Sequence, residues 1–392
     1  MPGRTITTSI TTAGLATLLA APFAGAQTFT AEPAPEWTAL FDRTSGWTGA
    51  DGIYSIPLSG NDAHGAASRT PTLFLFSDTA IGEVAPDGSR RPGATLVNNT
   101  LAIMRGDEPD PDRIRFITAE NLSGSPKAIF VPDTPNAQPD DWYWLGDGAV
   151  VDGATRLVAY RMRSNGQGGV FGFETAGVSI ITLPLDSRPP FDDHTQVEAP
   201  LFVPSDGEHG DTTYGAGIFV NTEAAGAPDP DGFVYIYGVR NDLSKKLLVA
   251  RVTPEAFMTF DAWRFYDGAE WVDDLHAAAP LTNRVSNELS VSPLPNGQYI
   301  LVFQTDALGH DVGVRVGETP VGPFGPVRRV YTAPEPSRDP EIFVYNAKAH
   351  PHLSAPDELL ISYNVNTLDF WGDFFRYADI YRPRFIRLKF NP

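Results

Sequence analysis

The sequence contains no cysteine among its 392 residues. A thiol nucleophile, thiolate zinc ligands and disulfide bonds are therefore excluded, and stability must come from a large hydrophobic core. Long apolar runs are also missing after residue 26, where no stretch approaches the length of a membrane-spanning helix. Basic clusters are missing too, and the formal net charge is −19. Such a chain is expected to repel nucleic acids and anionic lipids.

The first 26 residues have the pattern of a secretory signal peptide. Arg4 precedes an apolar run from Ala13 to Ala24, and the small residues Ala24-Gly25-Ala26 follow. We expect cleavage after Ala26, a secreted or periplasmic protein, and one monomeric domain over residues 27–392. A retained membrane anchor is the alternative, although the apolar run is short for a membrane span.

Helical periodicity is scarce, and the apolar segments have the character of strands. They are short and rich in β-branched and aromatic residues, and turn sequences such as PDG, DPDG and PNG separate them. Examples are TLFLF, RLVAY, FVYIYGV, YILVF and ELLISYNV. One short helical turn is expected at TPEAFMTF, with Thr253 as its N-cap. These features predict an all-β protein.

A sequence phrase recurs about five times: a polar or Gly-rich start, then a strongly apolar strand and one or two further strands. The copies are WTGADGIYSIPL…TLFLFSDT, WYWLGDGAVVDGATRLVAYRM, YGAGIFVN…DGFVYIYGV, SNELSVSPLPNGQYILVF and NAKAHPHLSAPDELLISYNV. Blade-sized spacing between the copies predicts a five-bladed β-propeller with four-stranded antiparallel blades. Residues 27 to about 40 are expected to close the ring against the last blade. Another all-β arrangement is the alternative.

In a propeller, the starts of the innermost strands surround a central funnel. Polar side chains at these starts, and at the end of the strand TLFLF, are Asp51, Asp78, Asp147, Tyr214, Asn287, Glu288, Lys348 and His350. Glycoside hydrolysis needs two carboxylates beside the scissile bond, so the four acids are candidate catalytic residues. Turn-forming roles are the alternative for Asp51, Asp78 and Asp147. Trp144 and Trp371 lie near these starts in the sequence and are candidate stacking partners for sugar rings.

Several of these motifs resemble those of exported five-bladed propeller proteins of the glycoside hydrolase type. They are WTGADGIYSIPL…LFLFSDT, LVNNTLAIM, WYWLGDGAVVDG and NAKAHPHLS…ELLISYNVN. The likeness is strongest to a group described as a domain of unknown function that includes endo-D-arabinanases, and weaker to arabinanases, β-xylosidases and levansucrases. This resemblance implies hydrolysis of a polysaccharide, with arabinofuranosyl linkages as one substrate. It implies that Asp51 and Asp78 act together, whereas the more distant families place an acid where Glu288 stands. Asn99, Tyr214, Lys348 and His350 would position sugar hydroxyls.

Two other classes of function remain open. Strict alternation in NAKAHPH predicts that Asn346, Lys348, His350 and His352 lie on one side of a strand. The two imidazoles have the spacing of a zinc pair, with Asp147 or Glu288 as a third ligand, which would make a metal-dependent hydrolase. A structural Ca²⁺ on the propeller axis is another option, although the expected chemistry requires no cofactor. The second class is a propeller that binds a glycan without cleaving it.

Overall fold

The computed structural model describes residues 27–169 and 171–391. The expected signal peptide lies outside these residues. Strands dominate, and the α-helices are two short ones, α1 (Pro35–Leu40) and α2 (Phe370–Phe374). Seven 3₁₀ turns complete the described helices: η1 (Ala66–Arg69), η2 (Pro254–Ala256), η3 (Phe260–Ala262), η4 (Leu275–Ala277), η5 (Glu335–Ser337), η6 (Pro351–Leu353) and η7 (Ala378–Tyr381). The prediction of an all-β protein is confirmed. The turn expected at TPEAFMTF is η2, where Thr253 is the N-cap residue but its side chain makes no capping hydrogen bond.

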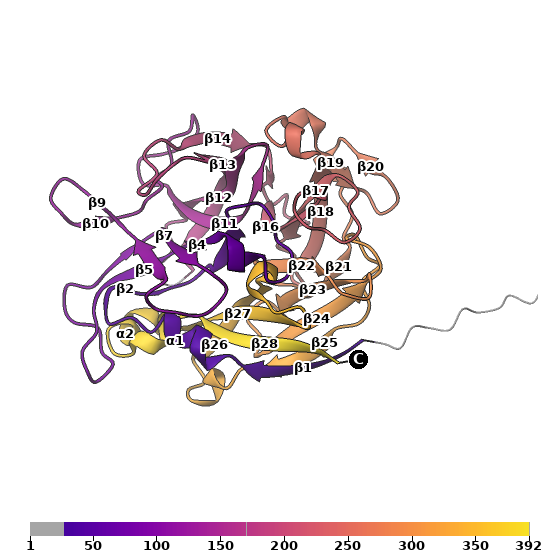
Figure 1. Cartoon of the computed structure of the whole chain (residues 1–392). Helices are drawn as coiled ribbons and strands as arrows, with labels where there is room; N and C mark the ends of the chain where they lie inside the picture. Colours follow the sequence, from indigo (N-terminus) through magenta and orange to yellow (C-terminus); the bar gives the residue numbers. More distant parts are fainter. Residues whose placement is uncertain (1–26, 170, 392) are drawn as a thin grey trace, which may run out of the picture.

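Five antiparallel sheets of four or more strands are arranged around a common centre (Figure 1). The first contains β3 (Tyr54–Pro57), β4 (Pro71–Phe76), β7 (Thr100–Arg105) and β8 (Ile114–Ile117). The second contains β11 (Trp142–Val151), β12 (Ala154–Ser164), β13 (Phe173–Pro184) and β14 (Thr195–Ala199). The fourth contains β22 (Leu289–Pro293), β23 (Tyr299–Gln304), β24 (Asp311–Gly317) and β25 (Arg328–Thr332).

The third sheet corrects the expectation that every sheet has four strands, because it has seven. They are β15 (Phe202–Val203), β16 (Thr212–Asn221), β17 (Phe233–Arg240), β18 (Lys246–Val252), β19 (Arg264–Tyr266), β20 (Trp271–Val272) and β21 (Thr282–Asn283). Its three additional strands are two-residue pieces that pair along the edges of the longer strands. Such short segments carry too little alternation for a sequence pattern to reveal them.

The two ends of the described chain meet in the fifth sheet. Its order is β1 (Thr28–Pro33), β28 (Arg384–Asn391), β27 (Glu358–Thr367) and β26 (Ile342–Ala349). Thr28 pairs with Asn391, and in Figure 1 the indigo β1 lies beside the yellow β28. This pairing confirms that the segment after residue 26 closes against the last sheet.

One strand from each sheet lines the centre, in chain order, because β3 contacts β11, β11 contacts β16, β16 contacts β22 and β22 contacts β26. Ser55 of β3 and His350 beyond β26 complete the circle with a 2.7 Å hydrogen bond. Separate apolar clusters lie between neighbouring sheets. Strands such as β4 and β23 are buried on both faces, which explains their continuous apolar runs.

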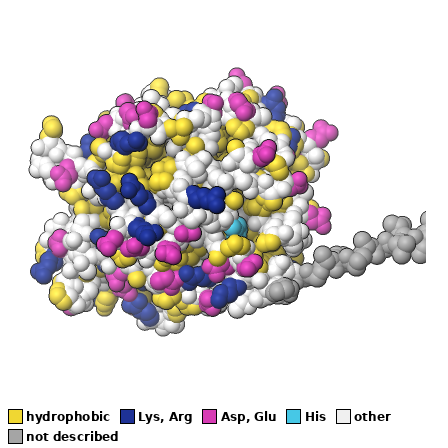
Figure 2. All heavy atoms as spheres, viewed as in Figure 1, with side chains coloured by type: hydrophobic (Ala, Val, Ile, Leu, Met, Phe, Trp, Pro, Cys, Tyr) yellow, Lys and Arg dark blue, Asp and Glu magenta, His cyan; other side chains and the backbone are white. Residues whose placement is uncertain are grey.

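Short strands outside the five sheets belong to the connections. β2 (Ser45–Ala50), β5 (Thr79–Glu83) and β6 (Thr95–Val97) form a three-stranded sheet, and β9 (Ala119–Glu120) pairs with β10 (Pro126–Lys127). Acidic and basic side chains are interspersed on the face shown in Figure 2. Among the described residues, no helix has both the length and the apolar composition needed to cross a bilayer.

Candidate functional site

Asp51 and Asp78 lie side by side at the ends of two neighbouring strands. The Asp51 N–H donates to the Asp78 carbonyl oxygen at 3.2 Å, and the Ser77 N–H donates to the Asp51 carbonyl oxygen at 3.0 Å. Gly52 follows with a φ of +63°, and a Cβ at this position would come within 2.8 Å of Ser77 Oγ. A left-handed glycine is therefore needed to hold Asp51 against the second strand. In the sequence TGADG, the second glycine therefore allows the turn that holds Asp51 in place.

Asp51 combines a strongly raised pKa with an oxygen that has no protein partner. The Tyr345 hydroxyl donates to Oδ2 at 3.0 Å, whereas Oδ1 is buried without a hydrogen-bond partner. Burial raises the pKa of Asp51 well above its usual range, and the negative charges of Asp78 and Glu288 raise it further. Hydrogen bonds from Tyr345 and Tyr381 oppose these effects only in part. The protonated acid is thus favoured at this position.

Asp78 is better prepared to carry a negative charge. Its Oδ1 accepts hydrogen bonds from Trp144 Nε1 at 2.8 Å and from Asn98 Nδ2 at 3.1 Å. Burial raises the pKa of Asp78 to about 6, and these two donors limit the rise. Trp144, predicted to stack on sugar, therefore also fixes an acid, and its ring packs at 4.5 Å against Phe173.

Glu288 is a third carboxylate whose charge acts on Asp51. Lys348 Nζ lies 2.6 Å from Glu288 Oε2, and Asn346 Nδ2 donates to Oε1 at 2.8 Å. Burial raises the pKa of Glu288, while Lys348 and Asn346 lower it. The ammonium also lies 4.7 Å from the centre of the Tyr54 ring. Lys348 consequently meets an acid and an aromatic ring in an almost fully buried position.

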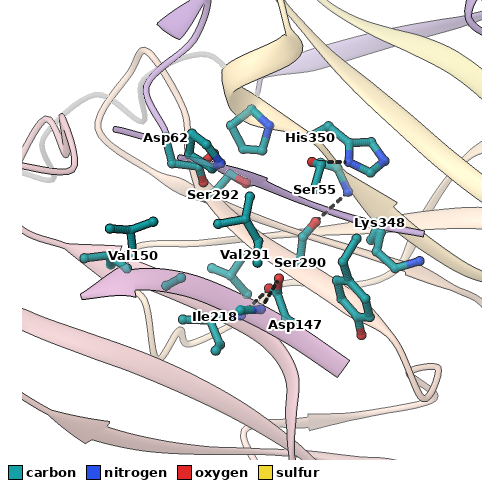
Figure 3. Close-up of a pocket in the computed structure, with 18 of the residues that line it drawn as sticks. Ser55, Asp62, Asp147, Val150, Ile218, Ser290, Val291, Ser292, Lys348 and His350 are labelled. Atoms are coloured by element: carbon teal, nitrogen blue, oxygen red, sulfur yellow. Dashed lines mark hydrogen bonds between the residues drawn. The ribbon is translucent and has the colours of Figure 1, made fainter. Parts of the chain in front are cut away.

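Asp147 connects β11 of the second sheet with β16 of the third sheet. It lies in a β-bulge of β11, where Oδ1 accepts from the Gly148 N–H at 2.8 Å and Oδ2 accepts from the Ile218 N–H at 2.7 Å. Burial raises the pKa of Asp147 to about 7 despite these two donors. Asp147 lines a central cavity of about 50 Å³ together with Ser55, Lys348 and His350, as Figure 3 shows. With both oxygens bonded to backbone, Asp147 holds two strands together.

Three residues that are predicted to contact the substrate lie in three different kinds of surroundings in the structure. The Asn99 side chain is fully buried and bonds to the backbone of Phe130 and Tyr143, so its amide has no group free for a sugar. Tyr214 is buried in the apolar core between the second and third sheets. Asn287 is exposed and lies beside Glu288 in the chain. Asn99 is therefore corrected to a structural residue, whereas Tyr214, whose buried hydroxyl has no hydrogen-bond partner, stays a prediction.

The expected face of alternating polar side chains near residue 350 is also corrected. A bulge with Asn346 at a φ of +59° interrupts β26, and the strand ends at Ala349. His350 is held by Ser55 Oγ at 2.7 Å and Ser362 Oγ at 2.8 Å, whereas His352 bonds to Asp62 at 2.7 Å. The two imidazoles thus have separate partners rather than a shared face. Within residues 27–169 and 171–391, no group of three or more His, Asp or Glu side chains is suited to hold a metal.

The sequence reasoning missed several polar groups around the acids. Strict alternation puts Tyr345 on the opposite side of the strand from Asn346, and nothing in LVNNT distinguishes Asn98 from Asn99. Tyr160 reaches the site from a second strand, with its hydroxyl buried and unpartnered. Glu288 and Asp147 lie close enough to raise the pKa of Tyr160 beyond the effect of its burial. Gly146 gives room for this ring, since a Cβ there would lie 3.0 Å from it.

A profile of the family described as "Domain of unknown function (DUF5005)" matches residues 35–390. None of the curated proteins matches the sequence significantly. Among solved structures, the chain is similar to a Bacteroides ovatus protein provisionally described as a hydrolase, with a TM-score of 0.67 and 19% identity. That similarity covers 94% of this chain and 93% of the other, and it indicates a common fold.

Fainter similarities extend to described glycoside hydrolases. An α-L-arabinofuranosidase from Podospora anserina, solved with cellotriose, has a TM-score of 0.42 and 12% identity over 89% of this chain and 98% of its own. A thermostable family-43 glycoside hydrolase has a TM-score of 0.41 and 12% identity over 82% and 89%. Similarities this faint carry no argument about substrate, so the chemistry of the site must be judged from its own residues.

Proposed function

Because the chain belongs to the DUF5005 family, whose description names no activity, we propose a function from the site itself: hydrolysis of a glycosidic bond in a polysaccharide. The observation that carries this proposal is the pairing of two adjacent carboxylates in unlike environments. Asp51 has a raised pKa and a free buried oxygen, whereas Asp78 accepts two N–H donors. Two titratable groups with separated roles are the requirement of glycosidic acid–base catalysis.

The different environments of Asp51 and Asp78 assign their roles as acid and base. Asp51 acts as the general acid and passes its proton to the glycosidic oxygen as the bond to the anomeric carbon breaks. Asp78 acts as the carboxylate that accepts a proton from the attacking water, whose hydroxyl joins the anomeric carbon. Transfer of this proton back to Asp51 through solvent completes the cycle. Glu288 and Asp147 are carboxylates of the same funnel, and Glu288 keeps the acid protonated through its charge.

The hydroxyl of Tyr160 and the indole of Trp144 supply contacts for the substrate. A buried phenol without a protein partner costs free energy unless water or ligand satisfies it. The motifs of the first and second sheets suggest an arabinofuranosyl linkage, as in endo-D-arabinanases. A screen against arabinan, xylan, fructan and arabinogalactan identifies the sugar.

The fold, export and assembly form part of the proposal. The five sheets serve as the blades of a five-bladed propeller whose funnel contains the acids. Residues 1–26 direct secretion or export to the periplasm and are removed after Ala26, and the mature protein acts as a monomer. N-terminal sequencing of the exported protein, with Gln27 as the expected first residue, tests the cleavage site.

No metal is required in this proposal. A Ca²⁺ ion needs six to eight oxygen ligands. The central cavity instead contains the Lys348 ammonium, an imidazole and an Asp147 carboxylate whose oxygens both accept backbone N–H groups. These residues do not fit a Ca²⁺ site. We expect hydrolysis to survive EDTA treatment, and loss with chelator that Zn²⁺ restores would return the two histidines to consideration.

Separate substitutions Asp51→Asn and Asp78→Asn test the proposal. Each should lower kcat at least about 100-fold while substrate binding persists, since one general acid or base contributes on the order of 10²–10⁴ to the rate. Exposed Asp192→Asn is the matched control and should leave the rate unchanged. Reducing ends measure hydrolysis, and calorimetry with an oligosaccharide measures binding. Binding without hydrolysis in the unaltered protein would identify a non-catalytic glycan-binding protein.

A further inference from the structure

The connection from β27 to β28 exposes an unusual group of large apolar side chains. Trp371 is 63% exposed, Phe375 is 41% exposed and Tyr377 is 43% exposed. Isolated exposed apolar residues are ordinary on protein surfaces, whereas groups of them mark binding sites. Trp371 and Phe375 both pack on the Phe374 ring, at 6.1 and 5.0 Å, and Tyr377 follows two residues later. We call Trp371, Phe375 and Tyr377 the aromatic platform.

The platform is held in place from beneath. Arg90 is 3% exposed and donates to the carbonyl oxygens of Phe374 at 2.7 Å and Ala378 at 3.1 Å. Its guanidinium carbon also lies 4.6 Å from the centre of the Phe374 ring. The Asp369 side chain accepts from the Gly372 N–H and caps α2. The exposed rings are therefore presented by an anchored backbone, which lowers the entropic cost of binding a ligand.

The aromatic platform lies toward the end of the fifth sheet where Tyr345 bonds to Asp51. β27 runs antiparallel to β26, with Thr367 opposite Ile342, so this connection leaves the sheet at the end where Tyr345 reaches Asp51. The Phe370 ring lies 5.1 Å from Trp371 and 5.2 Å from Tyr381.

Tyr381 in turn lies beside the acid pair. Burial raises the pKa of the Tyr381 phenol, and the charge of Asp51 raises it further. The turn η7, which contains Tyr381, packs on β2, the strand that leads into Asp51. Figure 1 shows α2 on the same side of the molecule as β2. Packed rings, among them the buried Tyr381, thus connect the surroundings of Asp51 with the platform.

We propose that the aromatic platform binds sugar units of the polysaccharide chain that extend beyond the funnel. The C–H faces of sugar rings pack on aromatic faces, and the platform follows the end of β27 that lies toward Tyr345 and Asp51. The occupant is therefore the substrate polymer itself, and the enzyme prefers long chains over short oligosaccharides. This inference rests on the proposed function for its substrate.

A triple substitution, Trp371→Ala with Phe375→Ala and Tyr377→Ala, tests the platform. With branched arabinan, KM should rise about three- to tenfold at unchanged kcat, which corresponds to the loss of one or two stacking contacts. With an arabinotriose substrate, both constants should stay unchanged. Leu243→Ala, which removes another exposed apolar side chain, is the control and should alter neither substrate. An unchanged KM for arabinan, or an equal loss with both substrates, overturns the proposal.

Binding measured without catalysis separates this inference from the proposed function. The Asp51→Asn protein should be retarded in a native gel that contains arabinan, and the added triple substitution should abolish the retardation. If the unaltered protein hydrolyses nothing but is retarded by arabinan, and the triple substitution abolishes that retardation, the platform stands and the hydrolase proposal fails. If hydrolysis occurs and the gel shows no difference, only the platform fails. A platform-dependent dimer in light scattering would instead identify a second copy as the occupant.

Discussion

Asn98 and Asn99 are adjacent in the sequence but have opposite roles in the structure. The sequence indicated that LVNNT was important but could not show which amide reached the acids. Asn98 and Asn99 lie in the bend between β6 and β7, where Asn98 reaches Asp78 while Asn99 enters the protein interior. A correct prediction would have required the register of this segment, which depends on its pairing with distant strands.

The two amides should respond differently to substitution. Asn99→Ala removes three hydrogen bonds to buried backbone groups and should lower the free energy of unfolding by about 3 kcal/mol. Asn98→Ala should change stability little. It removes a donor to the charged form of Asp78, so the pKa of Asp78 rises and the acidic limb of the rate profile moves to higher pH.

Chemical unfolding and a pH–rate profile measure the two effects. A stability loss for Asn98→Ala that equals that of Asn99→Ala would contradict the assignment. Trp144→Phe provides a second test, because it removes the other donor to Asp78 and should shift the acidic limb in the same direction.

Bulges are the elements that decide the geometry of the site. The strand core of each sheet was readable from apolar runs such as TLFLF, because both faces of those strands are buried. The bulges at Asp147 and Asn346 were not readable, since an inserted residue changes the side on which later residues lie. For this reason the alternation misplaces Tyr345, and it groups His350 with His352 although the two imidazoles have separate partners.

Substitution at Asn346 should separate backbone and side-chain effects. Asn346→Gly retains the left-handed backbone but removes the amide that bonds to Glu288, so the fold should persist while catalysis weakens. Asn346→Val should be about 1–2 kcal/mol less stable than Asn346→Gly, because a β-branched residue is strained at positive φ. Thermal unfolding of both variants measures this difference, and equal stabilities would contradict the role of the bulge.

The whole molecule should be most stable in mildly acidic solution. The ordinary pKa of an Asp is 3.8, whereas burial raises that of Asp78 to about 6 and that of Asp147 to about 7. Between about pH 4 and pH 7 the folded protein therefore binds more protons than the unfolded chain, and stability falls as pH rises. The melting temperature should be higher at about pH 5 than at about pH 8.

The double substitution Asp78→Asn and Asp147→Asn should weaken this dependence, because its amides do not titrate while Asp51 and Glu288 keep their raised pKa values. Asp141 has a lowered pKa from its bonds to Arg163 and Arg161, and it contributes in the opposite sense only below about pH 4. A melting temperature that rises between pH 5 and pH 8 would contradict the raised pKa values of the funnel.

The pairing of β1 with β28 has a consequence for the order of folding. Thr28 and Asn391 meet from opposite ends of the described chain, so the fifth sheet requires a contact of the greatest sequence separation. Such contacts form slowly, because the entropy of closing a long loop opposes them. A growing chain must keep β1 unpaired until its last strand has been synthesised. The ring thus stays open until synthesis ends, so the proposed export would meet a chain whose fifth sheet is still incomplete.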